Sequence, residues 1–415
     1  MFAWVARALG GYAMSRPDLR RLYAVTFLSF LGVSVTFPLR LLYAQAHHAT
    51  PVQIGILAAS FLIAPLLSQI PMGWLVDRWG RVPMIVVALI SHAIITLLYI
   101  VLNSPIDLIV LRFLEGVTVS ALQPATAAYI ADVTPEEHRS EAYGVLGAVL
   151  SSGMLIGPLV GGLIGQYGGF AAAFVVNFVV EVIAVALIPG QLHEPVEHRE
   201  RREKRPSVPW SRLFSIPLAG AYVAFFCTQI VMGVLGSLWS IWVRDLGGSY
   251  TYIGLTFSAF AAPQIFFGGL AGRMGQRMGR ARLLLGAGLG AAVIYASYGY
   301  VTSLVAIMVL GVIEGVFIVF QTPLAQGLLA DVSPPDARGR AQGVAGAAGA
   351  IGGASAAFAS LPLYHWSRAS PFIMAGVVMA VGSVMAAFGA IVWENRRREQ
   401  TMVLEDTITN SNAIA

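Results

Sequence analysis

The stretch Gly73-Trp-Leu-Val-Asp77-Arg78-Trp-Gly80-Arg81 lies between two long apolar runs, and a related stretch occurs 199 residues later. The second copy, Gly272 to Arg280, keeps the two glycines and the two arginines at the same spacing. It has Gln276 where the first copy has Asp77. A polar motif that recurs between apolar runs indicates that the surrounding structural unit is itself repeated.

The repeat extends outward from this motif without a gap. Gly55 pairs with Gly254 before the motif, and Gly153 pairs with Gly352 after it, at the same offset of 199 residues. Equivalent loops carry the same charges, so the two copies have the same orientation and each holds an even number of spans. Parallel repeats of this kind relate two bundles about an axis normal to the membrane, with a substrate site between them.

The apolar runs are long enough to cross a bilayer, which takes ~20 mainly apolar residues. The chain is 57% hydrophobic and 11% charged, whereas soluble proteins have ~25% charged residues. We therefore predict an all-α membrane protein with twelve transmembrane helices in two pseudo-symmetric six-helix bundles. The expected spans are residues 22–45, 53–76, 82–102, 106–131, 141–165, 170–190, 217–243, 252–274, 281–301, 304–330, 341–362 and 371–393.

Arginine is distributed asymmetrically between the two sides of this topology. The side of both termini carries nearly all of it, and the other side has little beyond Arg244 and Arg368, so both termini are expected in the cytoplasm. The predicted parts are a cytoplasmic N-terminal segment (1–21), a bundle (22–190), a cytoplasmic linker (191–216), a second bundle (217–394) and a cytoplasmic tail (395–415). Within the tail, residues 400–415 are expected to be disordered.

Other classes of protein are disfavoured by the same residues. The net charge is +5, but the basic residues are spread over short loops and form no nucleic-acid-binding stripe. Cys227 is the only cysteine, and no metal or redox motif surrounds it. No glycine-rich loop ends in Lys-Ser or Lys-Thr, which disfavours direct ATP coupling, and no nucleophile–base constellation suggests an enzyme.

The Gly73–Arg81 stretch resembles the hallmark motif of the major facilitator superfamily, and the resemblance covers residues 22 to 394. It implies that the aspartate and second arginine pair with an acid at the cytoplasmic end of span 4. The cluster would act as a latch between the halves in the outward-open state. A solvated loop that only sets topology is the alternative. The implied gating residues are Gly73, Asp77, Arg78, Gly80, Arg81 and Asp132.

The fifth span resembles the motif of the family's antiporters, which shapes the contact with span 8. Small residues four apart form a groove for a partner helix, and proline bends the span. The repeat partner has Ala356 and Ala357 in place of the central Gly-Pro, so the motif is confined to one half; packing alone is the alternative. The motif residues are Gly153, Gly157, Pro158, Gly161 and Gly162.

Ionisable residues inside spans are costly and usually face a cavity. Arg112 and Glu115 are three apart on span 4 and can neutralise each other, and the family associates an arginine at the Arg112 position with proton transfer. Glu314 is the repeat partner of Glu115 but has Gly311 where the arginine would be. We expect Glu314 to be a stronger candidate for the proton-binding site than Glu115. Structural carboxylates in polar interhelical contacts are the alternative.

Further intramembrane residues are candidates for a substrate cavity. Arg40 either contacts an anionic substrate or extends to the outer interface. His92 is interpreted as a packed histidine. The family's drug antiporters usually have a second proline where this chain has Leu41. The candidate cavity residues are Arg40, Gln123, Glu181, Gln229 and Phe317.

Together these features, with the resemblance to the twelve-span drug:proton antiporters, predict a monomeric, multi-pass secondary transporter of the cell membrane. We expect proton-coupled efflux of a small hydrophobic or amphipathic compound by alternating access. The proton gradient supplies the energy, with no cofactor, metal or nucleic acid. The alternatives are an importer or a lipid, sugar or metabolite transporter on the same fold, or a transport-inactive membrane sensor.

Overall fold

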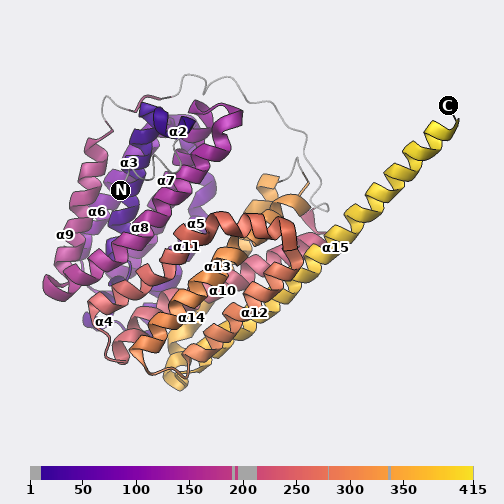
Figure 1. The fold of residues 1–415 in the computed structure, drawn as a ribbon. Helices are drawn as coiled ribbons and strands as arrows, with labels where there is room; N and C mark the ends of the chain where they lie inside the picture. Colours follow the sequence, from indigo (N-terminus) through magenta and orange to yellow (C-terminus); the bar gives the residue numbers. More distant parts are fainter. Residues whose placement is uncertain (1–10, 189–191, 195–212, 279, 335–337, 415) are drawn as a thin grey trace.

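The computed structural model describes residues 11–188, 192–194, 213–278, 280–334 and 338–414, and every regular element in these ranges is a helix (Figure 1). The N-terminal half contains α2 (Tyr12–Ser15), α3 (Pro17–Thr36), α4 (Arg40–Ala46), α5 (Pro51–Trp79), α6 (Arg81–Val101), α7 (Pro105–Val133), the 3-10 turn η1 (Glu136–His138), α8 (Arg139–Tyr167) and α9 (Gly169–Ala186). The C-terminal half contains α10 (Ile216–Asp245), α11 (Tyr250–Met278), α12 (Arg280–Tyr298), α13 (Leu304–Val332), α14 (Arg338–Trp366) and α15 (Ser370–Ile414).

Within the described residues twelve helical segments have 18 residues or more when α3 and α4 are counted as one. Among the described residues, ten helices are both long and apolar enough to cross a membrane, and α3 with α4 is one of them. The other two, α7 and α11, have 29 residues each. The predicted all-α membrane fold is therefore confirmed, and apolarity alone supports ten of the twelve spans.

The sequence repeat is also a structural repeat. Helices α5, α7 and α8 each begin and end 199 residues before α11, α13 and α14. Short loops separate the helices, and a serine or threonine caps several of them: Thr50 accepts a hydrogen bond from the Gln53 backbone, and Ser303 accepts one from the Ala306 backbone. Such caps satisfy backbone N–H groups that have no partner within the helix, so the helix starts are encoded locally.

Two bundles result, with two equivalent contacts between them. In the N-terminal half α3 packs on α8 and α9, and α7 packs on α5 and α6. In the C-terminal half α10 packs on α14 and α15, and α13 packs on α11 and α12. Between the halves α8 packs on α11, and α5 packs on α14.

Paired glycines permit the approach of backbones at these two contacts. A Cβ on Gly55 of α5 would lie 2.8 Å from the backbone oxygen of Phe358 on α14, and a Cβ on Gly254 of α11 would lie even closer to the backbone oxygen of Pro158 on α8. Any side chain at these positions would push the bundles apart. The repeat therefore encodes the interface between the halves twice.

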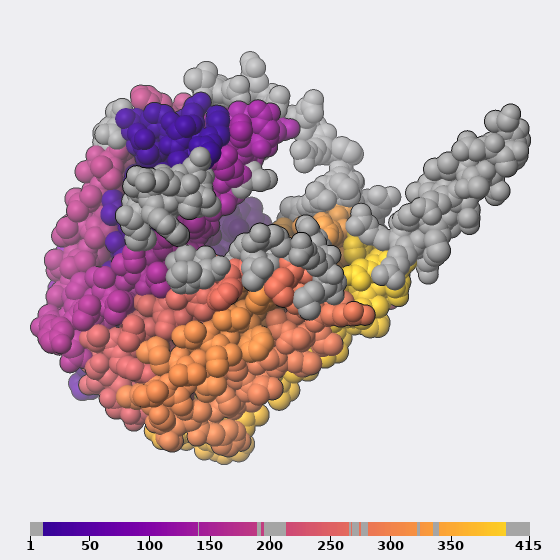
Figure 2. Space-filling model, in the orientation of Figure 1, coloured from indigo at the N-terminus to yellow at the C-terminus, as the bar shows by residue number. Residues whose placement is uncertain are grey.

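The two halves meet near the end of the molecule that carries α4 and separate toward the opposite end, where α3 and α10 begin (Figure 2). At the closed end the Tyr250 backbone donates a hydrogen bond to Gln166 at 3.1 Å. A cavity between the halves is thus closed at one end of the molecule only.

The C-terminal tail differs from the sequence expectation. Residues 400–414 were expected to be disordered, but α15 continues to Ile414 and projects beyond the bundle (Figure 1). The expectation of disorder is wrong for these residues because it relied on polarity. No glycine or proline follows Gly389, so nothing in the local sequence interrupts the helix.

Candidate functional site

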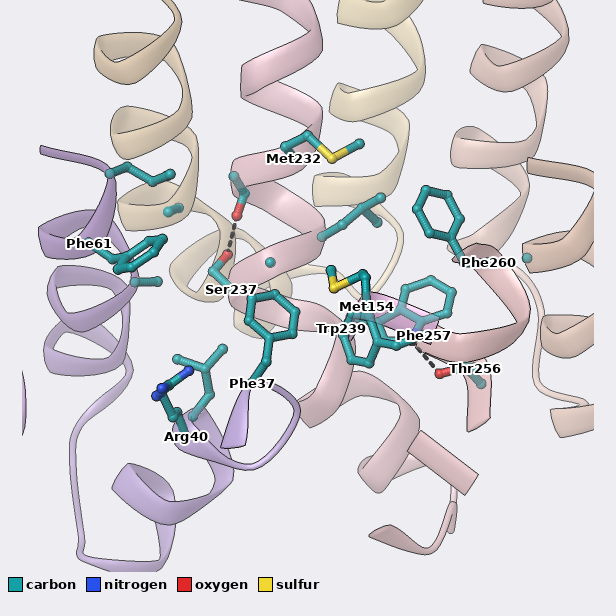
Figure 3. A pocket seen from close by; sticks show the side chains of 18 of the residues that line it. Phe37, Arg40, Phe61, Met154, Met232, Ser237, Trp239, Thr256, Phe257 and Phe260 are labelled. Carbon is teal, nitrogen blue, oxygen red and sulfur yellow. Dashed lines mark hydrogen bonds between the residues drawn. The ribbon is translucent and has the colours of Figure 1, made fainter. Parts of the chain in front are cut away.

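A cavity of about 250 Å³ lies between the two bundles (Figure 3). Its walls are mostly apolar and include five aromatic rings and two methionine side chains, with three charged side chains among them. Phe37 of the N-terminal half meets Phe257 of α11 edge to face, with ring centroids 5.3 Å apart. The charged and aromatic residues that line the cavity are Phe37, Arg40, Phe61, Arg112, Trp239, Phe257, Phe260 and Glu314.

Arg40 enters this cavity because the first span is broken. Pro38 lacks a backbone N–H, α3 ends at Thr36 and α4 begins at Arg40. The Arg40 guanidinium donates from Nη1 to the backbone oxygen of Val33 at 3.3 Å and from Nη2 to Glu115 Oε1 at 2.6 Å. Only 3% of Arg40 is exposed. The interpretation that Arg40 extends to the outer interface is therefore wrong, because its charge is paired inside the bundle.

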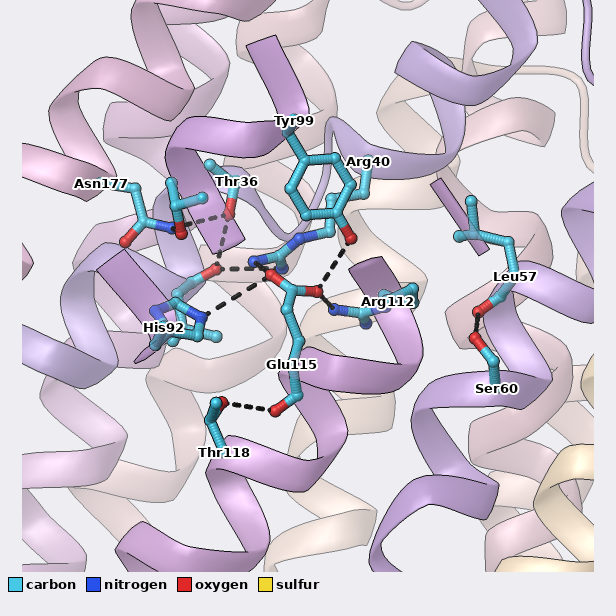
Figure 4. Close-up of polar contacts among 12 residues, drawn as sticks. Thr36, Arg40, Leu57, Ser60, His92, Tyr99, Arg112, Glu115, Thr118 and Asn177 are labelled. Atoms are coloured by element: carbon cyan, nitrogen blue, oxygen red, sulfur yellow. Dashed lines mark hydrogen bonds and ion pairs between the residues drawn. The ribbon is translucent and has the colours of Figure 1, made fainter. Parts of the chain in front are cut away.

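Glu115 on α7 is the centre of a buried ionic cluster (Figure 4). Arg40 donates to Oε1, and Arg112 donates to Oε2 at 2.7 Å. Tyr99 on α6 donates to Oε2 at 3.2 Å. The Arg112 guanidinium also lies over the Phe61 ring, 3.9 Å from its centroid, a favourable cation–π geometry. Two cations and a hydroxyl therefore stabilise the charged form of this carboxylate.

His92 and Glu181 extend the ionic cluster away from the cavity. His92 Nε2 lies 3.7 Å from Glu115, and its Nδ1 lies 3.0 Å from Glu181 Oε1. Ser29 on α3 donates to the same Glu181 oxygen at 3.1 Å. Sequence reasoning interpreted His92 as a packed histidine and missed this link. His92, Glu115 and Glu181 come from three helices, and a single sequence does not show that they face one another.

Glu314 on α13 has no cation in comparable contact among the described side chains. Tyr298 donates to its Oε2 at 2.6 Å, and the buried hydroxyl of Tyr295 lies nearby. The other oxygen, Oε1, has no hydrogen-bond partner in the described part of the chain. Glu314 is 2% exposed, yet it lines the cavity. A buried carboxyl in this setting can exist in the neutral form, because burial penalises its charge.

The gating residues come together at the start of α6. Arg81 donates from Nε to Asp132 at 3.0 Å and from Nη1 to Asp77 at 3.1 Å. The Arg78 guanidinium lies over the Trp74 ring at 5.1 Å. No described atom lies within 4 Å of a Cβ placed on Gly73, so no neighbouring helix uses that glycine in this state.

Glu194 completes this cluster, and sequence reasoning did not identify it. Its carboxylate accepts hydrogen bonds from the backbone N–H groups of Arg81 at 2.7 Å and Val82 at 2.8 Å. It therefore caps the N-terminus of α6, where a negative charge is favourable. Gly80 has φ of 103°, and a Cβ there would lie 2.6 Å from the Glu194 carboxylate. The glycine is needed for both the turn and the cap.

The C-terminal copy of this motif cannot be compared in the same way. Gly279 lies outside the described residues, and the side chains of Gln276, Arg277 and Arg280 lie outside the described side chains. The contacts implied by the family motif can therefore be followed in the first copy only.

The glycines of the antiporter-type motif on α8 face two different helices. Gly153, Gly157 and Gly161 lie against α3, and Gly162 lies against Tyr250 and Thr251 of α11. The Pro158 backbone also contacts α11, at Gly254. Both the expected contact with the eighth span and an additional contact within the bundle therefore depend on this motif.

Of the five candidate cavity residues, Arg40 alone is among those that line the described cavity. Glu181 is buried against His92, and Gln123 is exposed. Gln229 packs against Gly349 and Gly353 of α14, and Phe317 packs against Gly290 of α12. The other four were chosen for residue type on a span. The rotation of each helix, which residue type does not reveal, directs them elsewhere.

The fold and the cavity define a helical membrane protein with two repeated bundles around a central, partly charged site. The sequence model of the Major Facilitator Superfamily matches residues 22–238 and 221–402. The chain belongs to the major facilitator superfamily, whose members are transporters. The family resemblance seen in the sequence is confirmed.

Named relatives match a shorter part of the chain. Multidrug resistance protein 2 of Bacillus subtilis is 32% identical over 131 residues, which are 31% of this chain and 32% of the relative. Quinolone resistance protein NorA of Staphylococcus aureus is 26% identical over 135 residues, or 32% of this chain and 35% of the relative. The matches thus span about a third of each relative's length.

A solved structure agrees over most of the fold. A bacterial homolog of the human lysosomal transporter Spinster, in an inward-facing and unoccupied conformation, has a TM-score of 0.68 and 16% identity. The match covers 89% of this chain and 94% of that one. At this identity the similarity shows the fold alone.

Proposed function

We propose that this protein is a proton-coupled exporter of small hydrophobic or amphipathic compounds, working by alternating access as a monomer in the cell membrane. The observation that carries the proposal is Glu314. It is buried, lines the cavity between the bundles and has no arginine partner like those of Glu115 among the described side chains. Such a carboxyl can take up a proton when the cavity opens to one side and release it on the other.

The walls of the cavity support the nature of the substrate. Rings of Phe37, Phe61, Trp239, Phe257 and Phe260 line it, and such surfaces favour ligands with an apolar body. The names of the two relatives, which refer to multidrug and quinolone resistance, support export of drug-like compounds. The antiporter-type motif on α8 supports the same direction of transport.

We also propose that both termini lie in the cytoplasm, as the distribution of arginine indicates. In that orientation the open end of the molecule, where α3 and α10 begin, faces the cytoplasm. Single cysteines at His47 and His198, introduced after removal of Cys227, test the orientation with an impermeant thiol reagent. Labelling of position 198 only from outside the cell would reverse it.

Proton coupling is tested in proteoliposomes with an imposed pH gradient and a panel of lipophilic compounds. Substrate-driven proton flux is expected in the wild type and in Glu115→Gln, provided the latter folds. Glu314→Gln is expected to show flux no greater than empty liposomes. Undiminished flux in Glu314→Gln together with its loss in Glu115→Gln would assign the proton to Glu115 instead. Transport that does not respond to the pH gradient would refute proton coupling.

A further inference from the structure

Two groups of opposite charge in the cavity have hydrogen-bonding atoms without partners. Arg40 Nε and Glu314 Oε1 are both buried, and neither has a hydrogen-bond partner among the described residues. Both residues line the cavity, Arg40 from α4 and Glu314 from α13. A buried polar atom that lacks a hydrogen-bond partner is costly, even where the rest of the group is paired, as it is in Arg40. Two such groups in one cavity indicate a ligand that bonds to both.

The charges around the cavity favour a ligand of a particular kind. On the N-terminal side Arg40 and Arg112 share the single carboxylate of Glu115, which leaves an excess of one positive charge. Behind them His92 and Glu181 form an ion pair with no net charge when His92 is protonated. On the C-terminal side Glu314 is the ionisable acid, with the hydroxyls of Tyr298 and Tyr295 beside it.

A ligand with one charge fits this arrangement poorly. A simple cation that approaches Glu314 also meets the excess positive charge of the Arg40 side. A simple anion that approaches Arg40 also meets ionised Glu314. A ligand with both charges interacts favourably with each side, and its apolar body can lie against Phe37, Trp239 and Phe257 between them.

We propose that the cavity recognises amphipathic zwitterions, whose carboxylate lies beside the Arg40 guanidinium and whose ammonium group lies beside the Glu314 carboxyl. This inference deepens the proposed function and rests on it for the role of the cavity in transport. The ammonium group and a proton compete for the same carboxyl. Substrate release is therefore favoured when Glu314 takes up a proton. Exchange of a proton for substrate requires this negative coupling between the two binding events.

The experiment measures binding to the purified full-length protein at pH 7 by isothermal titration calorimetry. Three probes share one naphthyl body: 3-[6-(aminomethyl)-2-naphthyl]propanoate carries the two charges at opposite ends, 3-(2-naphthyl)propanoate carries only the carboxylate, and 2-naphthylmethylamine carries only the ammonium group. Since each charge-assisted hydrogen bond adds affinity, we expect the zwitterion to bind at least about tenfold more tightly than either single-charge probe. Equal affinity for the three probes, or tightest binding of the amine, would overturn the proposal.

Variants assign each charge to its partner. In Glu314→Gln the zwitterion should bind no more tightly than the propanoate. In the double variant Arg40→Gln/Glu115→Gln, which removes one charge of each sign, it should bind no more tightly than the amine. Glu137→Gln removes an exposed acid on η1 (side chain 78% exposed) and should keep the wild-type order. An unchanged order in Glu314→Gln would overturn the assignment, even if the double variant fails to fold.

The binding and transport experiments can refute the two proposals independently. Calorimetry needs no pH gradient, so the expected order of affinities together with absent proton-driven transport would refute the proposed function alone. Proton-coupled transport of other compounds, with no preference for the zwitterion in binding, would refute this inference alone.

Discussion

Glu115 and Glu314 occupy equivalent positions of the repeat, on α7 and α13, and their surroundings differ in charge. Each accepts a hydrogen bond from an equivalent tyrosine, Tyr99 at 3.2 Å and Tyr298 at 2.6 Å. Around Glu115 lie Arg40, Arg112, His92 and, one step further, Glu181. The equivalent positions in the second half hold Trp239, Gly311, Ala291 and Ala380.

This difference in charge shows how the two halves of a repeated fold can give equivalent glutamates different functions. Both halves keep the tyrosine–glutamate pair on the same two helices. The N-terminal half surrounds its glutamate with cations, which favours a permanently charged structural centre. In the C-terminal half no described cation contacts the glutamate beside the cavity, which favours exchange of protons and ligands. Substitutions that exchange residues between equivalent positions of the two halves test this comparison.

The largest effect is expected from giving Glu314 the arginine that Glu115 has. Gly311 occupies the position equivalent to Arg112 and lines the cavity, and a Cβ there lies 3.8 Å from the Tyr298 hydroxyl. In Gly311→Arg the new cation should hold Glu314 in its charged form. Proton flux in proteoliposomes should then fall to the background of empty liposomes.

A matched variant separates charge from bulk at this position. Gly311→Met adds a side chain of similar length without a charge, so it should narrow the cavity but retain proton coupling of the remaining transport. If Gly311→Met and Gly311→Arg lose coupling equally, occupied volume and not charge explains the loss, and the comparison of the two glutamates is wrong.

Removal of each glutamate's charge should affect stability very differently. Glu115→Gln leaves two buried guanidinium groups without their carboxylate, which should cost about 3–5 kcal/mol of unfolding free energy. Glu314→Gln leaves no buried cation unpaired among the described residues and should change stability by less than about 1 kcal/mol. Thermal unfolding of the purified variants measures both. Equal losses would show that Glu115 is not the structural member of the pair.

A smaller effect is expected from the gating cluster of the N-terminal half. In Asp77→Asn the carboxylate that accepts from Arg81 at 3.1 Å is lost, and we expect transport to slow by about a factor of five to ten, by analogy with other conformational couplings. The Asp77 side chain is 64% exposed, so stability should change by less than about 1 kcal/mol. Transport at the wild-type rate in purified, folded Asp77→Asn would refute the latch.

The last comparison concerns the stability that the two equivalent tyrosines contribute. Tyr298→Phe removes the hydrogen bond from the Tyr298 hydroxyl on α12 to Glu314, and should cost about 1–3 kcal/mol of unfolding free energy. Tyr99→Phe leaves Glu115 with both arginines and should cost about 1 kcal/mol or less. Chemical denaturation of the two variants compares them. A larger loss in Tyr99→Phe would mean that the arginines do not substitute for the hydroxyl.

Part of the candidate site could be predicted because its signals are local. Arg112 and Glu115 are three residues apart on one helix, and that spacing places them together, as the 2.7 Å contact shows. The contact of Arg81 with Asp132 was expected from the family motif and is present at 3.0 Å. Neither the Glu194 cap of α6 nor the His92–Glu181 pair has a local signal, because the partners are far apart in the chain.

The sequence by itself determined the membrane class, the two repeated bundles and the positions of most helices. Apolar length, the offset of 199 residues and the capping residues act locally or through the bilayer, so they can be identified without knowing the contacts. Only the tertiary structure decided which polar side chains meet. A helix that is apolar on nearly all faces has no clear buried side. Its rotation is set by close packing, such as Gly55 against Phe358, and that rotation brings Arg40 to Glu115 and leaves Glu314 facing the cavity.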